Sequence, residues 1–182
     1  MVERVLDAWQ ALVEERGYGA VTLSDVAARV GLSRSALYRY VPDKVALLQM
    51  LIDRSVSRFL DDLRDGLEES PDATAQLELF VRSQLRYFSS QRILGHDMST
   101  VLTADQHAEV MVHLAPIRDL MREIVTRGMA SGEFRPMDVE MATGMVFSVV
   151  GAHQMPLARG EADLGRVSDE TVEFVLGALR VR

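Results

Sequence analysis

Apolar residues recur at every third or fourth position along most of the chain, which is the spacing of one face of an α-helix. No segment alternates apolar and polar residues in the manner of a half-buried β-strand. The sequence therefore predicts an all-α protein of about nine helices. The helices are expected at residues 3–16, 22–30, 34–40, 44–66, 73–90, 92–102, 105–131, 138–157 and 168–181, with a break at Pro116.

The first 45 residues carry clear signals for helix ends. Thr22 and Asp25 have the spacing of a capping box, in which each side chain binds the backbone N–H of the other residue. A tight turn at Gly31 follows, and Ser33 can cap the next helix. Pro42 ends that helix, because the residue before a proline is kept out of the helical region. Two short helices joined by a turn that contains glycine form a helix-turn-helix unit.

The second helix of this unit has a distinct outward face. Leu37 and Val41, four residues apart, form its inward stripe, so the side chains at the opposite positions point outward. Arginine can bind guanine O6 and N7 with two hydrogen bonds, whereas tyrosine hydroxyls and free backbone N–H groups suit phosphate. The residues predicted to contact DNA are Thr22, Ser24, Ser33, Arg34, Ser35, Ala36, Tyr38, Arg39 and Tyr40. A plain helical hairpin inside a bundle is the alternative interpretation.

The net charge of −7 does not argue against DNA binding once it is divided along the chain. Residues 1–45 carry six basic and six acidic side chains, so the excess negative charge lies in residues 46–182. The stretch 29–44 holds four basic residues against one acidic residue, and a phosphate backbone responds to such a local patch. We therefore expect a DNA-binding domain at 1–45 and a larger helical domain at 46–182.

Several other kinds of site are not expected. The chain has no cysteine, which excludes a disulfide framework, a thiolate zinc site and a cysteine nucleophile. The histidines form no His-x-x-x-His pair, and neither a nucleophile with a paired base nor a glycine-rich phosphate loop is present. The amino terminus lacks a signal-peptide pattern, and the longest apolar stretch, 144–152, is far shorter than the roughly 20 residues of a membrane-spanning helix. The sequence therefore predicts a cytoplasmic protein without catalytic site, metal, cofactor or membrane partner.

Residues 5–52 resemble the amino-terminal signature of the TetR family of transcriptional regulators. The resemblance is carried, at fixed spacings, by ERGY (15–18), TLSDVA (22–27), GLSRSALYRY (31–40) and DKVALL (43–48). It implies a three-helix DNA-binding domain, an obligate homodimer and repression that a ligand usually relieves. The recognition helix of the family corresponds to Arg34–Tyr40. Val41 stands where many members have phenylalanine, and the basic arm that often precedes the first helix is nearly absent.

The resemblance also assigns a phosphate contact to Lys44, at the start of the fourth helix. Lys44 is the single lysine of the chain, whereas the other nineteen basic residues are arginine. A lysine kept in such a sequence suggests a position that needs a compact ammonium instead of a planar guanidinium. Chance use of lysine is the alternative.

By the same resemblance, the last two helices, 138–157 and 168–181, pair with their symmetry mates in a four-helix bundle. The first of them is apolar on almost every side and is expected to be buried all round. The residues predicted for the dimer interface are Val146, Val150, Val172 and Leu176.

A pocket for a small lipophilic effector is expected in the larger domain. The helix at 73–90 has an apolar face that includes a glutamine, and methionines from neighbouring helices can line an adaptable cavity. The residues predicted to bind ligand are Phe80, Gln84, Tyr87, Phe88, Met98, Met111, Met121 and Met145. Ordinary core packing is the alternative explanation of the same stripes.

Three functions remain open at this point. The leading hypothesis is a repressor that binds a palindromic operator in double-stranded DNA as a homodimer and that a ligand releases. The second is a DNA-binding regulator that has no effector or is governed by a protein partner. The third is a helical enzyme or scaffold that happens to contain the hairpin.

Overall fold

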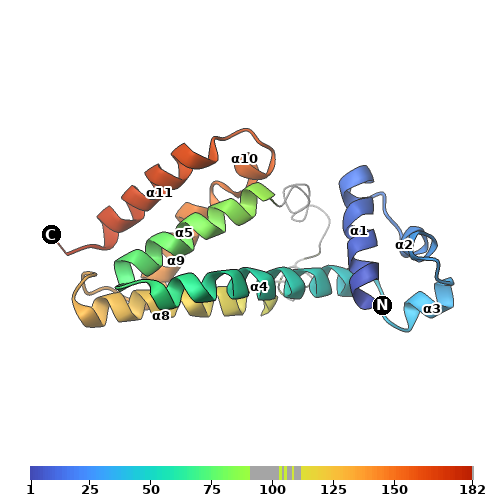
Figure 1. The fold of residues 1–182 in the computed structure, drawn as a ribbon, viewed down its shortest axis with the longest axis horizontal. Helices are drawn as coiled ribbons and strands as arrows, with labels where there is room; N and C mark the ends of the chain where they lie inside the picture. Colours follow the sequence, from blue (N-terminus) through green and yellow to red (C-terminus); the bar gives the residue numbers. More distant parts are fainter. Residues whose placement is uncertain (91–102, 104, 106–107, 109–111, 182) are drawn as a thin grey trace. The chain divides into compact units, whose positions relative to one another are not determined.

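The computed structural model describes residues 1–90, 103, 105, 108 and 112–181. Throughout these residues the fold is helical, as the hydrophobic spacing predicts, and one isolated antiparallel bridge joins Phe134 to Arg180 (Figure 1). The helix predicted at 92–102 and the first part of the one predicted at 105–131 lie outside the described residues.

The chain divides into two compact units. The amino-terminal unit comprises residues 1–56 together with the described part of 92–114, and the larger unit comprises 57–90 together with 115–181. Helix α4 (Lys44–Glu69) contributes its first half to the amino-terminal unit and its second half to the larger unit. The division therefore falls within a continuous helix.

Three short helices precede α4 in the amino-terminal unit: α1 (Val2–Arg16), α2 (Leu23–Val30) and α3 (Arg34–Tyr38). Their shared core is apolar and closed to solvent, and Trp9 at its centre is 1% exposed. Thr22 caps α2 in the predicted capping box, and Gly31 ends α2 in the left-handed conformation with a φ of 73°. Ser33 caps α3 by accepting a hydrogen bond of 3.2 Å from the backbone N–H of Ala36. The helix-turn-helix unit is thus formed by its own caps as well as by its core.

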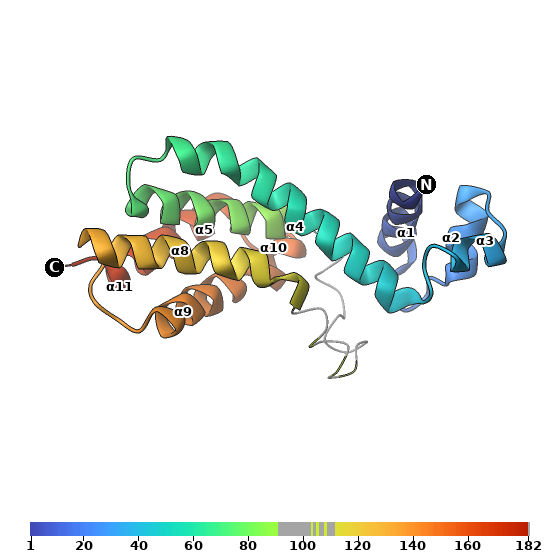
Figure 2. The ribbon, with the colours of Figure 1, turned by 90° about the horizontal axis from the view of Figure 1, so that it is seen from below.

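Helix α5 (Ala73–Ser90) lies at the centre of the larger unit. It contacts α8 (Ala115–Ser131), α10 (Gln154–Ala158) and α11 (Leu164–Leu179), and more narrowly α9 (Val139–Gly151). Figure 2 shows α8 and α9 running side by side below α5. The most deeply buried side chains of this core include Leu77, Phe80, Leu85, Met121, Ile124 and Val125.

Helix boundaries in the second half of the chain differ from the sequence-based ones at two places. The stretch predicted as one helix at 138–157 is two helices, α9 and α10, separated by a turn at Ala152 and His153. Asp163 caps α11 by accepting from the backbone N–H of Arg166 at 2.7 Å, so α11 begins earlier than predicted. Ser168, predicted as that cap, is buried inside the helix. The predicted break at Pro116 is confirmed, since α8 begins one residue before it.

The loop between α8 and α9 is fastened to α5 by Glu133. Its carboxylate accepts hydrogen bonds from the backbone N–H groups of Ala73 (3.2 Å) and Thr74 (2.8 Å) and from the hydroxyls of Thr74 (2.9 Å) and Ser131 (2.7 Å). Partial burial opposes the charge, but these hydrogen bonds outweigh it and lower the pKa of Glu133. A charged side chain thereby caps the amino terminus of α5, where the helix dipole favours an anion.

Candidate DNA-binding surface and ligand-binding core

Helix α3 presents the outward face that the sequence predicts. Leu37 and Val41 are fully buried, whereas Arg34, Ser35, Tyr38, Arg39 and Tyr40 are exposed and Ala36 is half-buried. The helix ends at Tyr38, two residues earlier than predicted, and the backbone N–H of Tyr40 bonds to the carbonyl of Leu37 in a turn. Polar and aromatic side chains are therefore gathered on a short helix whose opposite side is anchored in the core.

One arginine of this face is held by its neighbour. The guanidinium carbon of Arg34 lies 5.9 Å from the ring centre of Tyr38, one helical turn away, within the range of a cation–π contact. Tyr38 is itself 43% exposed, so the pair stands at the surface. Arg34 and Tyr38 therefore form a neighbouring cationic and aromatic pair on the exposed face of α3.

The start of α2 is less available than predicted. The backbone N–H of Thr22 donates to the Asp25 carboxylate at 2.8 Å, so the expectation that this N–H is free for phosphate is wrong. The Thr22 hydroxyl also donates to Asp25, and these hydrogen bonds hold the pKa of Asp25 below its usual value. Ser24 occupies the first turn of α2, where backbone N–H groups lack intrahelical partners. Ser24 is the better placed of the two residues for a phosphate oxygen.

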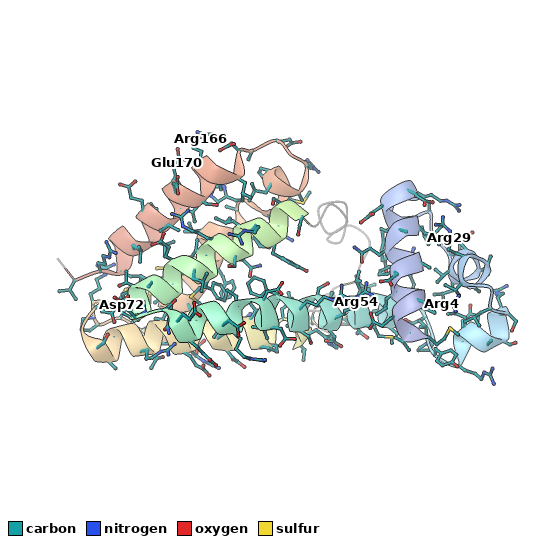
Figure 3. The ribbon with its side chains drawn as sticks, viewed as in Figure 1. Arg4, Arg29, Arg54, Asp72, Arg166 and Glu170 are labelled. Carbon is teal, nitrogen blue, oxygen red and sulfur yellow. The ribbon has the colours of Figure 1, made fainter. Side chains whose placement is uncertain are left out.

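Two of the four cations in the stretch 29–44 have partners within the unit. Arg29 forms an ion pair of 2.7 Å with Glu15, and the two residues lie on α2 and α1 (Arg29 is labelled in Figure 3). The Lys44 ammonium donates to the backbone carbonyl of Tyr18 and lies 4.1 Å from the centre of its ring. Burial lowers the pKa of Lys44. The local positive charge that faces outward is consequently carried by Arg34 and Arg39 more than by the other two.

A buried arginine joins α4 to α1. The Arg54 side chain is 8% exposed and donates to Glu3 (3.0 Å), Asp7 (2.6 Å) and Gln10 (3.0 Å), which follow one another along a single face of α1 (Figure 3). Five donors in a fixed planar fork allow one guanidinium to bind all three acceptors. The first half of α4 is therefore joined to α1 by charged hydrogen bonds.

The residues predicted to bind ligand separate into three groups. Phe80, Gln84 and Met121 are buried in the core of the larger unit, and Tyr87 and Phe88 are half-buried at its edge. The aromatic rings meet edge to face, with Phe59–Phe80 at 5.9 Å and Phe59–Tyr87 at 5.7 Å between ring centres. Met145 is 54% exposed and lies on the outer side of α9, so its assignment to an internal pocket is wrong. Met98 and Met111 lie outside the described residues.

All four residues predicted for a dimer interface are buried within the protomer. Val150, Val172 and Leu176 are 1–6% exposed and do not line the outer surface groove of α9 and α11, whereas Val146, which is 3% exposed, is part of the lining of that groove. The expectation that the helix from 138 is buried all round is also wrong. An apolar groove of about 580 Å³ instead runs over the outer faces of α9 and α11. Its lining includes Met137, Met141, Met145, Val149, Phe174 and Ala178.

The residues of this groove follow a spacing in the sequence that was overlooked when the helix from 138 was treated as buried on all sides. Met141 and Met145 are four residues apart on α9, as are Phe174 and Ala178 on α11, and each pair forms a second apolar stripe. Met141 and Met145 are both 54% exposed and Phe174 is 63% exposed. Large apolar side chains gathered in this way indicate a surface that another molecule covers.

The described residues contain neither a cluster of three or more potential metal ligands nor a helix able to cross a membrane. His113 pairs with Asp53 at 2.5 Å, and His96 and His107 lie outside the described residues. An exposed, polar recognition helix, capped and held on a three-helix core, defines a helix-turn-helix DNA-binding protein.

The comparison with known proteins identifies the family. The chain matches the profile of bacterial regulatory proteins of the tetR family at residues 5–51 and that of the tetracyclin repressor-like carboxyl-terminal domain at residues 74–175, more than half of its length. The chain belongs to the TetR family, and it is a DNA-binding transcriptional regulator.

Individual relatives agree in both sequence and fold. The HTH-type transcriptional repressor KstR of Rhodococcus jostii is 29% identical over 180 residues, covering 96% of this chain and 82% of that protein. The fatty acid metabolism regulator of Bacillus subtilis is 21% identical over 155 residues, covering 81% of this chain and 78% of that protein. The crystal structure of FadR from Bacillus subtilis in complex with stearoyl-CoA has the same fold, with a TM-score of 0.87 and 19% identity over 98% of this chain and 99% of that one.

Proposed function

We propose that this chain is a repressor that binds a palindromic operator as a homodimer in the cytoplasm and is released by a small lipophilic ligand. The observation that supports DNA binding is the exposed face of α3. Arg34, Ser35, Tyr38 and Arg39 are exposed on this side, whereas the residues on the inner side are fully buried. A helix of this size fits the major groove, and two copies related by a two-fold axis suit two half-sites.

The outer faces of α9 and α11 support the homodimer. Their groove is lined by apolar and small side chains, including the exposed Met141, Met145 and Phe174. Pairing with a symmetry mate would remove this surface from water and form a four-helix bundle. Of the four interface residues named from the sequence, Val146 lies in the lining of this groove, and the exposed Met141, Met145 and Phe174 are proposed in place of the other three.

Two features support a ligand sensor in the larger unit. Its core combines aromatic side chains with an adaptable methionine, Met121, around α5. A structural relative binds stearoyl-CoA, an amphiphile with a long hydrocarbon chain. The ligand would favour a conformation whose two recognition helices no longer fit successive major grooves. A thermal-shift screen against lipophilic compounds tests this part, because a ligand that binds the folded state must raise the melting temperature.

A gel shift with DNA flanking the protein's own gene tests the regulator assignment. Arg34→Ala and Arg39→Ala are expected to weaken operator binding by roughly five- to a hundredfold wherever the arginine reads a base. Arg166→Ala is the matched control, because Arg166 is an exposed arginine at the start of α11 in the larger unit (Figure 3). Unchanged affinity in both α3 variants would mean that another face contacts the operator.

Lys44→Ala is expected to weaken binding to all DNA sequences alike. The Lys44 ammonium gives one hydrogen bond to the Tyr18 carbonyl and keeps further N–H donors for a phosphate. Loss of one phosphate contact should flatten the slope of log affinity against log salt by about one unit. The measurement is a titration of operator affinity at several salt concentrations, with circular dichroism as a check on folding. If Lys44→Ala were less stable but its operator affinity had the same salt dependence as that of the parent protein, Lys44 would contact Tyr18 and not the DNA.

A further inference from the structure

Gln84 occupies the centre of the apolar inner face of α5. It is 6% exposed, and its neighbours one turn away on the same face are Phe80, Tyr87 and Phe88. Phe80 meets Phe147 of α9 at 6.1 Å between ring centres. A buried polar amide thus lies on the same helix face as an aromatic cluster that extends to α9.

The Gln84 amide lacks a hydrogen-bond partner among the described residues. Its Oε1 atom is buried and unpaired, and neither amide atom makes a hydrogen bond there. The Oε1 atom of Gln76, two turns earlier on the same face, is also buried and unpaired, but the Nε2 atom of Gln76 donates to the backbone carbonyl of Leu67 at 2.9 Å. A buried acceptor without a partner is costly, so a position that keeps one calls for an explanation beyond packing. Gln76 has a structural role that Gln84 lacks.

Among the described residues of the larger unit, the buried polar residues are Gln76, Gln84, Thr143, Ser168 and Thr171. None of these side chains ionises in the physiological range. A carboxylate or phosphate brought beside Gln84 would lose its hydration without gaining a cation. A neutral polar group avoids that cost.

We propose that the Gln84 amide is the polar anchor for the effector, and that the effector is a neutral, largely apolar molecule with a hydroxyl group. The hydroxyl donates to Oε1 of Gln84, and the surrounding rings of Phe59, Phe80 and Tyr87 contact its hydrocarbon part. This assignment rests on the proposed sensor function and narrows its ligand class. A sensor that held the charged groups of an acyl-CoA beside Gln84 would differ from the one proposed here.

Two isomeric probes test the assignment directly. Decanol carries a hydroxyl donor, whereas methyl nonyl ether has the same atoms and accepts a hydrogen bond without donating one. The full-length protein is expected to bind decanol about tenfold more tightly than the ether by isothermal titration calorimetry, the ratio that one buried hydrogen bond supports. The preference is expected to vanish in Gln84→Met, which keeps the length of the side chain and removes its polar atoms.

The same variant makes a second prediction of opposite sign. Without ligand, Gln84→Met is expected to melt at a higher temperature than the parent protein, because the unpaired amide is gone. Gln76→Met is the matched control: it also removes an unpaired Oε1 but loses the bond to Leu67, so it should melt lower than Gln84→Met, and it should keep the preference for decanol. Gln84→Leu serves as a second apolar replacement if Gln84→Met does not fold.

The outcomes separate this inference from the proposed function. Equal binding of the two probes by the parent protein, or a preference that survives in Gln84→Met, would overturn the role of Gln84 and leave the sensor intact. Binding of neither probe by the parent protein would overturn both the anchor and the lipophilic sensor.

Discussion

Phe174→Asp is expected to convert the protein into monomers and to lower its operator affinity by about a hundredfold or more. Phe174 is 63% exposed and forms part of the groove over α9 and α11. A carboxylate there would be buried against the apolar side chains of the second subunit, which disfavours association strongly. A monomer binds one half-site at a time and loses the gain in affinity that comes from binding both half-sites at once. This gain is commonly on the order of 10²–10⁴-fold. Light scattering and a gel shift measure the two effects.

The appropriate control for this substitution is Val150→Asp, on the inner side of α9. Val150 is 1% exposed, so a charge at this position is placed in the protomer's core and should unfold the larger unit. Phe174→Asp should instead keep the helical circular dichroism of the parent protein. A folded Phe174→Asp protein that remains fully dimeric would show that the subunits associate through another surface.

Gly128→Ala is expected to lower the melting temperature by roughly 5–10 °C, because overpacking of this size outweighs the helix propensity that alanine brings. Gly128 is buried on α8, and a Cβ atom there would lie 2.1 Å from Cδ2 and 2.3 Å from Cε2 of the Phe134 ring. Phe134 belongs to the α8–α9 loop, is 1% exposed, and is held beside Gly128 by the hydrogen bond of 2.9 Å from its backbone N–H to the Gly128 carbonyl. The measurement is thermal unfolding followed by circular dichroism.

Gly177→Ala provides the comparison. Gly177 is an exposed residue inside α11, and a Cβ atom there meets nothing within 4 Å. The substitution adds helix propensity without a clash and should raise the melting temperature by about 2 °C. A Gly128→Ala protein as stable as the parent would mean that the Phe134 ring has room to move.

The local part of the fold follows from the sequence because the determining interactions are short in range. The caps at Thr22 and Ser33 and the break at Pro116 involve residues within a few positions of each other, and all three were predicted. The outward face of α3 also followed from two inward residues four positions apart. The exposed face of α3 could therefore be predicted from periodicity and turn residues.

The outer surface of the larger unit could not be predicted from the sequence in the same way. An apolar residue on α9 faces either the protomer's core or a second molecule, and periodicity alone does not distinguish Val150 from Met145. The partners of Lys44 and Arg29 lie far away in the sequence, and the Oε1 atom of Gln84 has no partner among the described residues. Whether these side chains are paired depends on tertiary packing. The cap at Asp163 was missed because the polar residues around it look like an ordinary loop.

The three bonds of Arg54 to α1 also bear on how an effector could act. One guanidinium ties α4 to Glu3, Asp7 and Gln10, so the start of α4 and the first helix move together. In the proposed homodimer, a displacement of α4 would move the helix-turn-helix unit as one body and leave its contacts with a single half-site unchanged. The proposed ligand would then act by changing the distance between the two recognition helices. An operator whose half-sites are set farther apart or closer together would in that case bind the ligand-bound form better than the ligand-free form.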